Sequence, residues 1–182
     1  YEILIQETGN EIELGKLASE AEITYKTLHN YLEYFEESLL LNIVYNFSKS
    51  FRKSRKSLKK TYIASTNFYR LDERLTPQIK GQIIGHLAET YSYNLLKNNF
   101  EYVSIYKQRG KEIDFIARDD LLNTDYYYYI ESKYKNNLKH KDFKFLQQTA
   151  AKRKTKIPYL VFSKETFDIS ENGIIIPLYL IA

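Results

Sequence analysis

The sequence of 182 residues contains no cysteine, methionine or tryptophan, and only three prolines and six glycines. The absence of cysteine excludes disulfides and thiolate metal sites, and we expect an intracellular, cytoplasmic protein. No apolar run approaches the roughly 20 residues that cross a bilayer, and the first residues of the sequence lack the basic and apolar regions of a signal peptide, so no membrane association is expected. Because the sequence begins at Tyr1 and lacks methionine, we expect a piece of a longer protein.

The chain contains many apolar residues and one cluster of positive charge. Hydrophobic residues make up 43% of it, which is enough for one large domain or two small ones. The net charge is only +4, but seven of the twelve residues in the range 49–60 are Lys or Arg. Such a run attracts the phosphates of a nucleic acid without recognising its base sequence, although a solvated loop is the alternative interpretation. The residues predicted to bind DNA are Lys49, Arg52, Lys53, Arg55, Lys56, Lys59 and Lys60.

Residues 1–75 are predicted to form a winged-helix domain. Apolar residues recur at helical spacing twice within 11–40, and Thr24 is placed to cap the second helix. Apolar or aromatic residues at every second position predict a strand at 41–47, and a second strand is expected at 62–63. The basic run between these two strands would be the wing. The second helix also carries acidic residues that oppose DNA, which fits the protein-docking use of winged helices: Glu33, Glu36 and Glu37.

Residues 76–182 are predicted to form a second domain of mixed α/β character. Pro77 opens a long helix that we expect over about 79–96. The further elements expected are a strand at 100–107, a hairpin within 111–135, a helix at about 141–153, and strands at 157–162 and 174–180. The predicted order is therefore one helix, three strands, a second helix and two more strands.

The hairpin within 111–135 holds the candidate chemistry. If it is symmetric about 122–123, Asp114 lies opposite Glu131, with Cβ atoms about 5 Å apart. Two carboxylates that close raise each other's pKa unless a cation lies between them, and they suit Mg²⁺. Lys133, on the same face as Glu131, could orient a metal-bound water or stabilise a phosphoryl transition state. The alternative is a surface hairpin with an ion pair.

These residues resemble a known nuclease pattern. Glu89 lies near the apolar stripe of the long helix, where a carboxylate needs a partner. A helix-β-β-β-helix-β order with Glu in the first helix, Asp in the second strand and E-x-K in the third resembles the PD-(D/E)XK nuclease superfamily. More narrowly, four segments resemble the carboxy-terminal region of archaeal and bacterial AAA-type ATPases, which joins a winged helix to a nuclease-like fold: SKSFRKSRKSLKKTYIAS, GHLAE, YKQRGKEIDFIA and YIESKYK.

The resemblance implies a restriction-endonuclease-like mixed sheet flanked by helices, and roles for the matching residues. Asp114 and Glu131 would hold Mg²⁺ or Mn²⁺, Glu89 would complete the metal shell directly or through water, and Lys133 would act on the nucleophilic water. DNA is the implied partner, together with an AAA-type ATPase module upstream in the parent chain and a homo-oligomer. The sequence has no G-x-x-x-x-G-K-[ST] motif, so no ATP site is expected in this part of the protein.

Two functions follow from these observations. The first is a DNA endonuclease, a phosphodiester hydrolase that depends on Mg²⁺. The second is a catalytically inactive nuclease-fold module that docks DNA or protein or oligomerises the ATPase, with Lys133 neutralising Asp114 and Glu131 in place of a metal. A transcription regulator built on the winged helix alone would leave the last hundred or so residues unexplained.

Overall fold

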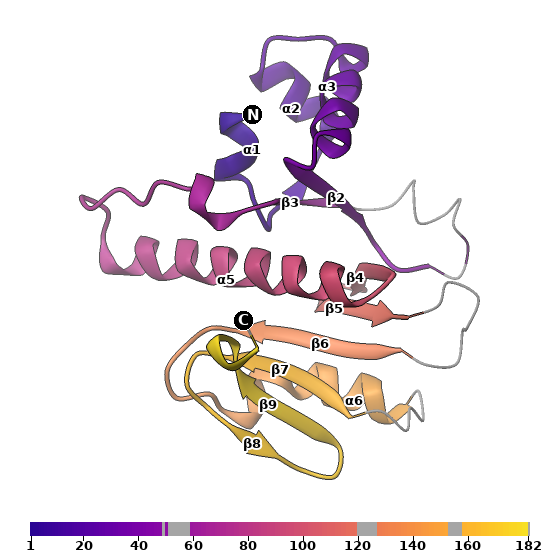
Figure 1. Cartoon of the computed structure of the whole chain (residues 1–182), viewed down its shortest axis with the longest axis vertical. Helices are drawn as coiled ribbons and strands as arrows, with labels where there is room; N and C mark the ends of the chain where they lie inside the picture. Colours follow the sequence, from indigo (N-terminus) through magenta and orange to yellow (C-terminus); the bar gives the residue numbers. More distant parts are fainter. Residues whose placement is uncertain (49, 51–58, 120–126, 153–157, 182) are drawn as a thin grey trace.

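The computed structural model describes residues 1–48, 50, 59–119, 127–152 and 158–181. The described residues form a mixed α/β structure with a three-stranded sheet, in the order β1-β3-β2, and a six-stranded sheet, in the order β4-β5-β6-β7-β9-β8. Figure 1 shows the small sheet and its helices on one side of the long helix α5, with the large sheet on the other. The predicted α/β class is confirmed.

The amino-terminal part contains the two helices and the strand pair that were predicted. Its elements are α1 (Glu2–Gln6), β1 (Glu11–Ile12), α2 (Leu14–Glu20), α3 (Tyr25–Glu37), β2 (Leu41–Tyr45) and β3 (Lys59–Ile63). Thr24 caps α3 as expected, because its Oγ1 accepts a hydrogen bond from the backbone N–H of Thr27 at 3.1 Å. The short elements α1 and β1 are additions to the prediction. Most of the predicted wing, residues 49 and 51–58, lies outside the described residues.

The first half of the carboxy-terminal part is a long helix followed by three antiparallel strands. A 3-10 turn, η1 (Thr66–Phe68), leads to α5 (Pro77–Asn99), β4 (Tyr102–Gln108), β5 (Lys111–Arg118) and β6 (Tyr128–Lys133). Positive φ angles of 51° at Arg109 and 75° at Gly110 make the tight turn between β4 and β5. Strands β5 and β6 pair with Phe115 opposite Ile130. That register is the predicted one, because it is symmetric about 122–123.

The second half completes the sheet with parallel strands. Its elements are η2 (His140–Phe143), α6 (Lys144–Lys152), β7 (Tyr159–Ser163), β8 (Asp168–Ile169), β9 (Gly173–Pro177) and η3 (Leu178–Leu180). Strand β7 runs parallel to β6, and β9 runs parallel to β7. The last strand was predicted to reach residue 180, but it ends at Pro177, which has no N–H to donate to a ladder.

Helices cover both faces of the large sheet. On one face, α5 residues such as Ala88 and Leu96 pack with Phe115 and Ile130. On the other face, Leu146 of α6 belongs to a second apolar cluster with residues of β5 and β7. The sheet is thus the middle of three layers, which is how a sheet with two apolar faces is buried. Among the described helices, none combines the length and apolar character that a membrane span requires.

The amino-terminal and carboxy-terminal parts share an apolar core. Tyr62 of β3 is fully buried, and its ring stacks on that of Tyr93 of α5 with centroids 4.6 Å apart. Beyond β2, the backbone N–H of Phe47 donates to the carbonyl of Ile105 at 2.7 Å, which covers part of the edge of the large sheet. The predicted boundary at 75–76 therefore falls between two parts that pack closely together.

Candidate functional site

The candidate site lies where β5 and β6 diverge. The paired part of these strands ends at Phe115 and Ile130. One step further along this register, Asp114 stands opposite Glu131, as the sequence predicted. The Asp114 carboxylate accepts the backbone N–H of Ser132 through Oδ2 at 2.8 Å. This hydrogen bond fixes the orientation of Asp114 and satisfies a backbone donor that the ladder leaves free.

A bulge in β5 sets the direction of Asp114. Ile113 and Ile116 have partners on β4, whereas Asp114 and Phe115 together face one residue of that strand. A bulge of this kind interrupts the alternation of side chains between the two faces of a sheet. As a result Phe115 packs in the core beneath α5, and Asp114 lies close enough to Glu89 of α5 to influence its ionisation.

Glu131 and Lys133 form a close ion pair beside Asp114. The Lys133 Nζ lies 2.5 Å from Glu131 Oε2 and 3.4 Å from Asp114 Oδ2. Glu131 is only 3% exposed and Asp114 8%. Although Glu131 Oε2 touches this ammonium, it accepts no well-formed hydrogen bond within the described part of the chain. The structure therefore brings together three of the four predicted catalytic side chains.

The pKa values of Glu131 and Lys133 reflect their burial and the charges close to them. Burial, followed by the negative charge of Asp114, raises the pKa of Glu131 well above its ordinary value, while Lys133 acts in the opposite direction. Burial alone would lower the pKa of Lys133, but the charges of Asp114 and Glu131 outweigh it and the pKa is raised. Lys133 consequently stays charged at neutral pH, and the carboxylate pair favours an additional proton or cation.

Glu89, the fourth predicted side chain, is bound by the amino-terminal part. Its Oε1 accepts hydrogen bonds from Lys60 Nζ at 2.9 Å and from the Tyr62 hydroxyl at 2.7 Å. Burial, with a further contribution from the charge of Asp114, raises the pKa of Glu89 from 4.5 to about 7, although Lys60 and Tyr62 oppose the change. Glu89 is thus held against β3.

Lys60 occupies a different position from the one predicted. It was assigned to DNA binding, but it is 6% exposed, and its Nζ lies 2.6 Å from Glu112 Oε1 as well as 2.9 Å from Glu89. Such a buried, paired ammonium cannot reach the phosphates of DNA. Lys59, the neighbouring residue, lies over the ring of Tyr45 at 5.7 Å from its centroid. The remaining predicted contacts lie outside the described residues: Lys49, Arg52, Lys53, Arg55 and Lys56.

Two residues of the site, Tyr62 and Glu112, were missed from the sequence, and a third, Lys60, was predicted in a different role. A signal for two of them was present, because the period of two along a strand places Lys60 and Tyr62 on the same face. Glu112 precedes Asp114 by two residues on β5. Nothing in the sequence indicated that this face of β3 would meet α5 and β5.

The donor groups fit a divalent cation only in part. Among the residues that the structure describes, no three His, Cys, Asp or Glu side chains are arranged to hold a metal ion, so the predicted shell of three carboxylates is not assembled. Asp114 and Glu131 do suit Mg²⁺ or Mn²⁺, because they are adjacent, buried oxygen donors and Glu131 Oε2 lacks a well-formed hydrogen bond. In this structure the single ammonium of Lys133 lies against both carboxylates.

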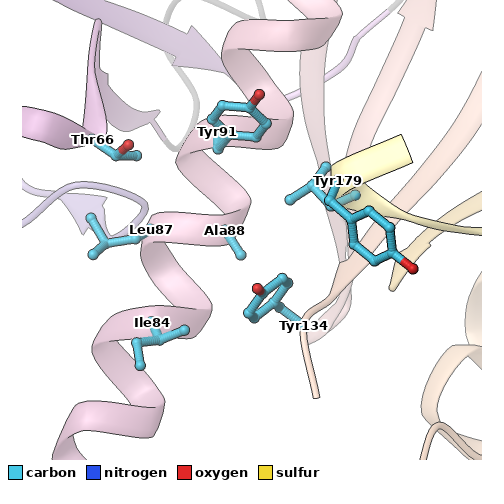
Figure 2. Close-up of a pocket in the computed structure, with 8 residues that line it drawn as sticks. Thr66, Ile84, Leu87, Ala88, Tyr91, Tyr134 and Tyr179 are labelled. Carbon is cyan, nitrogen blue, oxygen red and sulfur yellow. The ribbon is translucent and has the colours of Figure 1, made fainter. Parts of the chain in front are cut away.

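A groove of about 410 Å³ opens next to this cluster, between α5 and the end of β6. Figure 2 shows the rings of Tyr134 and Tyr179 across the groove from the side chains of α5. These two side chains are 36% and 65% exposed. Tyr134 directly follows Lys133, so this end of the groove lies one residue along the chain from the charged cluster. It is lined by Thr66, Ile84, Leu87, Ala88, Tyr91, Tyr134, Leu178 and Tyr179.

Comparison with known protein families finds two matches. Residues 84–181 match a domain of unknown function, DUF4143, which is typically found in the carboxy-terminal regions of AAA-type ATPases. Residues 1–70 match a second domain of unknown function, DUF8612. No curated protein and no solved structure gives a significant match. The first match contains Glu89, Asp114, Glu131 and Lys133, whereas the second contains Lys60 and Tyr62.

Proposed function

Since the chain belongs to the DUF4143 family, we propose that it is a divalent-metal-dependent DNA endonuclease domain from the carboxy-terminal part of an AAA-type ATPase. The observation that carries the proposal is the meeting of Asp114, Glu131 and Lys133 where β5 and β6 diverge. Further support is the order of helix, three antiparallel strands, helix and parallel strand, which suits a restriction-endonuclease-like fold.

Each residue of the site has a role in phosphodiester hydrolysis. Asp114 and Glu131 would hold Mg²⁺ or Mn²⁺, which when bound supplies Lewis acidity and lowers the pKa of a coordinated water. The Ser132 N–H keeps Asp114 oriented toward Glu131. Lys133 stays protonated beside both carboxylates, so its ammonium stabilises the negative charge that develops on the phosphoryl oxygens.

The surroundings of the site suit a nucleic acid. The rings of Tyr134 and Tyr179 offer flat faces on which an unstacked base can stack, an interaction worth about 1–3 kcal/mol per base. The basic range 49–59, which lies between β2 and the start of β3 in the sequence, would bind the phosphate backbone, as the wing of a winged helix does. An AAA-type module elsewhere in the parent chain would control access to DNA, and self-association would follow the assembly of that module.

A nicking assay tests this function. Supercoiled and branched DNA are incubated with Mg²⁺ or Mn²⁺ and with the wild-type protein, Glu131→Ala or Lys133→Ala. The exposed Glu165→Ala serves as a control outside the site. We expect metal-dependent cleavage that falls about 100-fold or more in both site variants, because one loses a metal ligand and the other loses transition-state stabilisation. Equal cleavage by all four proteins would contradict the proposal.

A docking module is the second candidate function. The observation that favours it is that Lys60 and Lys133 already pair with the carboxylates of the site. In that case the charged cluster would join the two parts of the chain, and DNA or protein binding would be the activity. Absence of cleavage and of metal binding, with DNA binding retained in all variants, would favour this candidate over the nuclease.

A further inference from the structure

We propose that Lys60 is a positioning residue that competes with a divalent metal ion for Glu89, which couples metal binding to the docking of β3 on α5. The inference rests on the proposed function, because it concerns the metal shell of the same site. It also explains why the predicted shell of three carboxylates is not assembled: the third carboxylate is occupied by a cation from the amino-terminal part of the chain.

The contacts of Glu89 carry the inference. Its Oε1 accepts two hydrogen bonds, from Lys60 Nζ at 2.9 Å and from the Tyr62 hydroxyl at 2.7 Å. Both donors come from one face of β3, and both are buried. These two hydrogen bonds hold the Glu89 carboxylate against β3. In the described residues, Glu89, Asp114 and Glu131 are not arranged around a common metal position, so a metal ion bound by Asp114 and Glu131 could gain Glu89 as a ligand only if this carboxylate moved away from its two donors.

The charge of the cluster supports competition between cations. Two ammonium groups, Lys60 and Lys133, pair with four carboxylates, two carboxylates each. With every group ionised, the formal charge is −4 from the carboxylates and +2 from the lysines, which gives −2. Removal of Lys60 would change it to −3 and strengthen the attraction for a divalent cation. The four carboxylates are Glu89, Glu112, Asp114 and Glu131.

The position of Lys60 in the fold turns this competition into coupling. Strand β3 is the central strand of the small sheet and pairs with β1 and β2. Lys60 cannot leave Glu89 and Glu112 without loosening the contact between this sheet and α5. By linkage, a metal ion that recruits Glu89 weakens that contact, and a stronger contact weakens the binding of the metal ion.

Titration with Mn²⁺, followed by electron paramagnetic resonance at pH 8, tests the proposal on the whole chain. The proteins are the wild type, Lys60→Met, Lys60→Met combined with Glu89→Gln, Glu131→Ala, and Lys107→Met. Lys107 is a matched control, because its ammonium also joins the two parts of the chain but pairs with Glu11. We expect Lys60→Met to bind Mn²⁺ about tenfold more tightly than the wild type, with the gain lost in the double variant and absent from Lys107→Met.

The outcomes separate this inference from the proposed function. If the wild type binds Mn²⁺, Glu131→Ala does not, and Lys60→Met matches the wild type, the competition is refuted while the metal site stands. A gain that survives Glu89→Gln also refutes it. If neither the wild type nor Lys60→Met binds Mn²⁺, both proposals fail.

A second variant keeps the proposal testable if Lys60→Met does not fold. Lys60→Gln keeps a hydrogen-bond donor near Glu89 but removes the charge, and it should show the same direction of change. In the wild-type protein, saturating Mn²⁺ should speed hydrogen exchange at the amides of β3 relative to those of α6. Unchanged exchange at β3 would contradict the coupling.

Discussion

At the scale of single residues, the site is defined by carboxylates that share too few cations. Glu89 and Glu131 are buried beside Asp114, and each has a raised pKa, caused first by burial and then by that neighbouring charge. Lys60 reduces this repulsion through its ion pair with Glu89, and Lys133 reduces it through its ion pair with Asp114. The proposed chemistry depends on this excess of negative charge, because it attracts a divalent cation.

The raised pKa of Glu89 predicts a pH dependence of stability. The folded protein keeps a proton on Glu89 up to about pH 7, whereas the unfolded chain releases it near 4.5. The contribution of Glu89 to the free energy of unfolding is therefore most favourable below pH 4.5 and falls as the pH rises to 7, by at most about 3 kcal/mol. Glu89→Gln lacks this titration.

Urea unfolding of both proteins between pH 4.5 and 8 checks this expectation. The stability of Glu89→Gln relative to the wild type should increase as the pH rises through this range. Any constant difference that comes from the altered contact with Lys60 does not affect the slope. Parallel curves for the two proteins would show that Glu89 ionises normally.

At the scale of elements, the sequence predicted those parts whose signals are local. Helix α5 begins at Pro77 and α3 is capped by Thr24, and both signals are visible in the sequence. The register of β5 against β6 also followed, because the polar loop marks the centre of the hairpin. The elements that were missed, α1, β1 and β8, have two to five residues and show little periodicity.

The start of β9 gives a prediction about packing. A Cβ atom at Gly173 would lie 2.1 Å from the ring of Tyr159 on β7, a buried side chain with little room to move. Gly173→Ala should therefore lower the free energy of unfolding by about 2 kcal/mol, because the ring must shift within a packed core. Gly81→Ala is the control, since nothing lies within 4 Å of its Cβ position and α5 should gain up to about 1 kcal/mol.

Chemical denaturation of the two alanine variants measures both effects in one experiment. The expected order of stability is Gly81→Ala, wild type, Gly173→Ala. A Gly173→Ala protein as stable as the wild type would mean that β7 and β9 are less closely packed than the structure shows.

At the scale of the whole molecule, the two parts of the chain form one core around α5. Sequence patterns separated them at 75–76, because each part has its own periodic elements. The patterns could not predict the contact between the two parts, because β3 and α5 are separated in the sequence and meet only in the folded protein. For the same reason Lys60 was grouped with the basic run that precedes it, although its side chain turns inward.

Tyr62 tests this shared core. Its ring contacts those of Tyr93 and Phe115, and its hydroxyl donates a hydrogen bond to Glu89. Tyr62→Ala should lower the free energy of unfolding by about 4 kcal/mol, because it leaves a large cavity and removes a donor from a buried carboxylate. Tyr34→Ala, at a position that is 58% exposed, should have little effect.

Thermal unfolding followed by circular dichroism and by tyrosine fluorescence distinguishes one core from two. With a shared core, both probes should give one coincident transition in the wild type and in Tyr62→Ala. Two separate transitions in the wild type, with only the first shifted by the substitution, would indicate two independent units.

The central claim is that Asp114 and Glu131 together bind a divalent cation. Diffraction from crystals grown with Mn²⁺ tests it most directly, because the anomalous signal of the metal gives its position. The account predicts one strong peak in contact with carboxylate oxygens of both residues and near Lys133. A map with no peak at this point, from protein that is saturated with Mn²⁺, would contradict it.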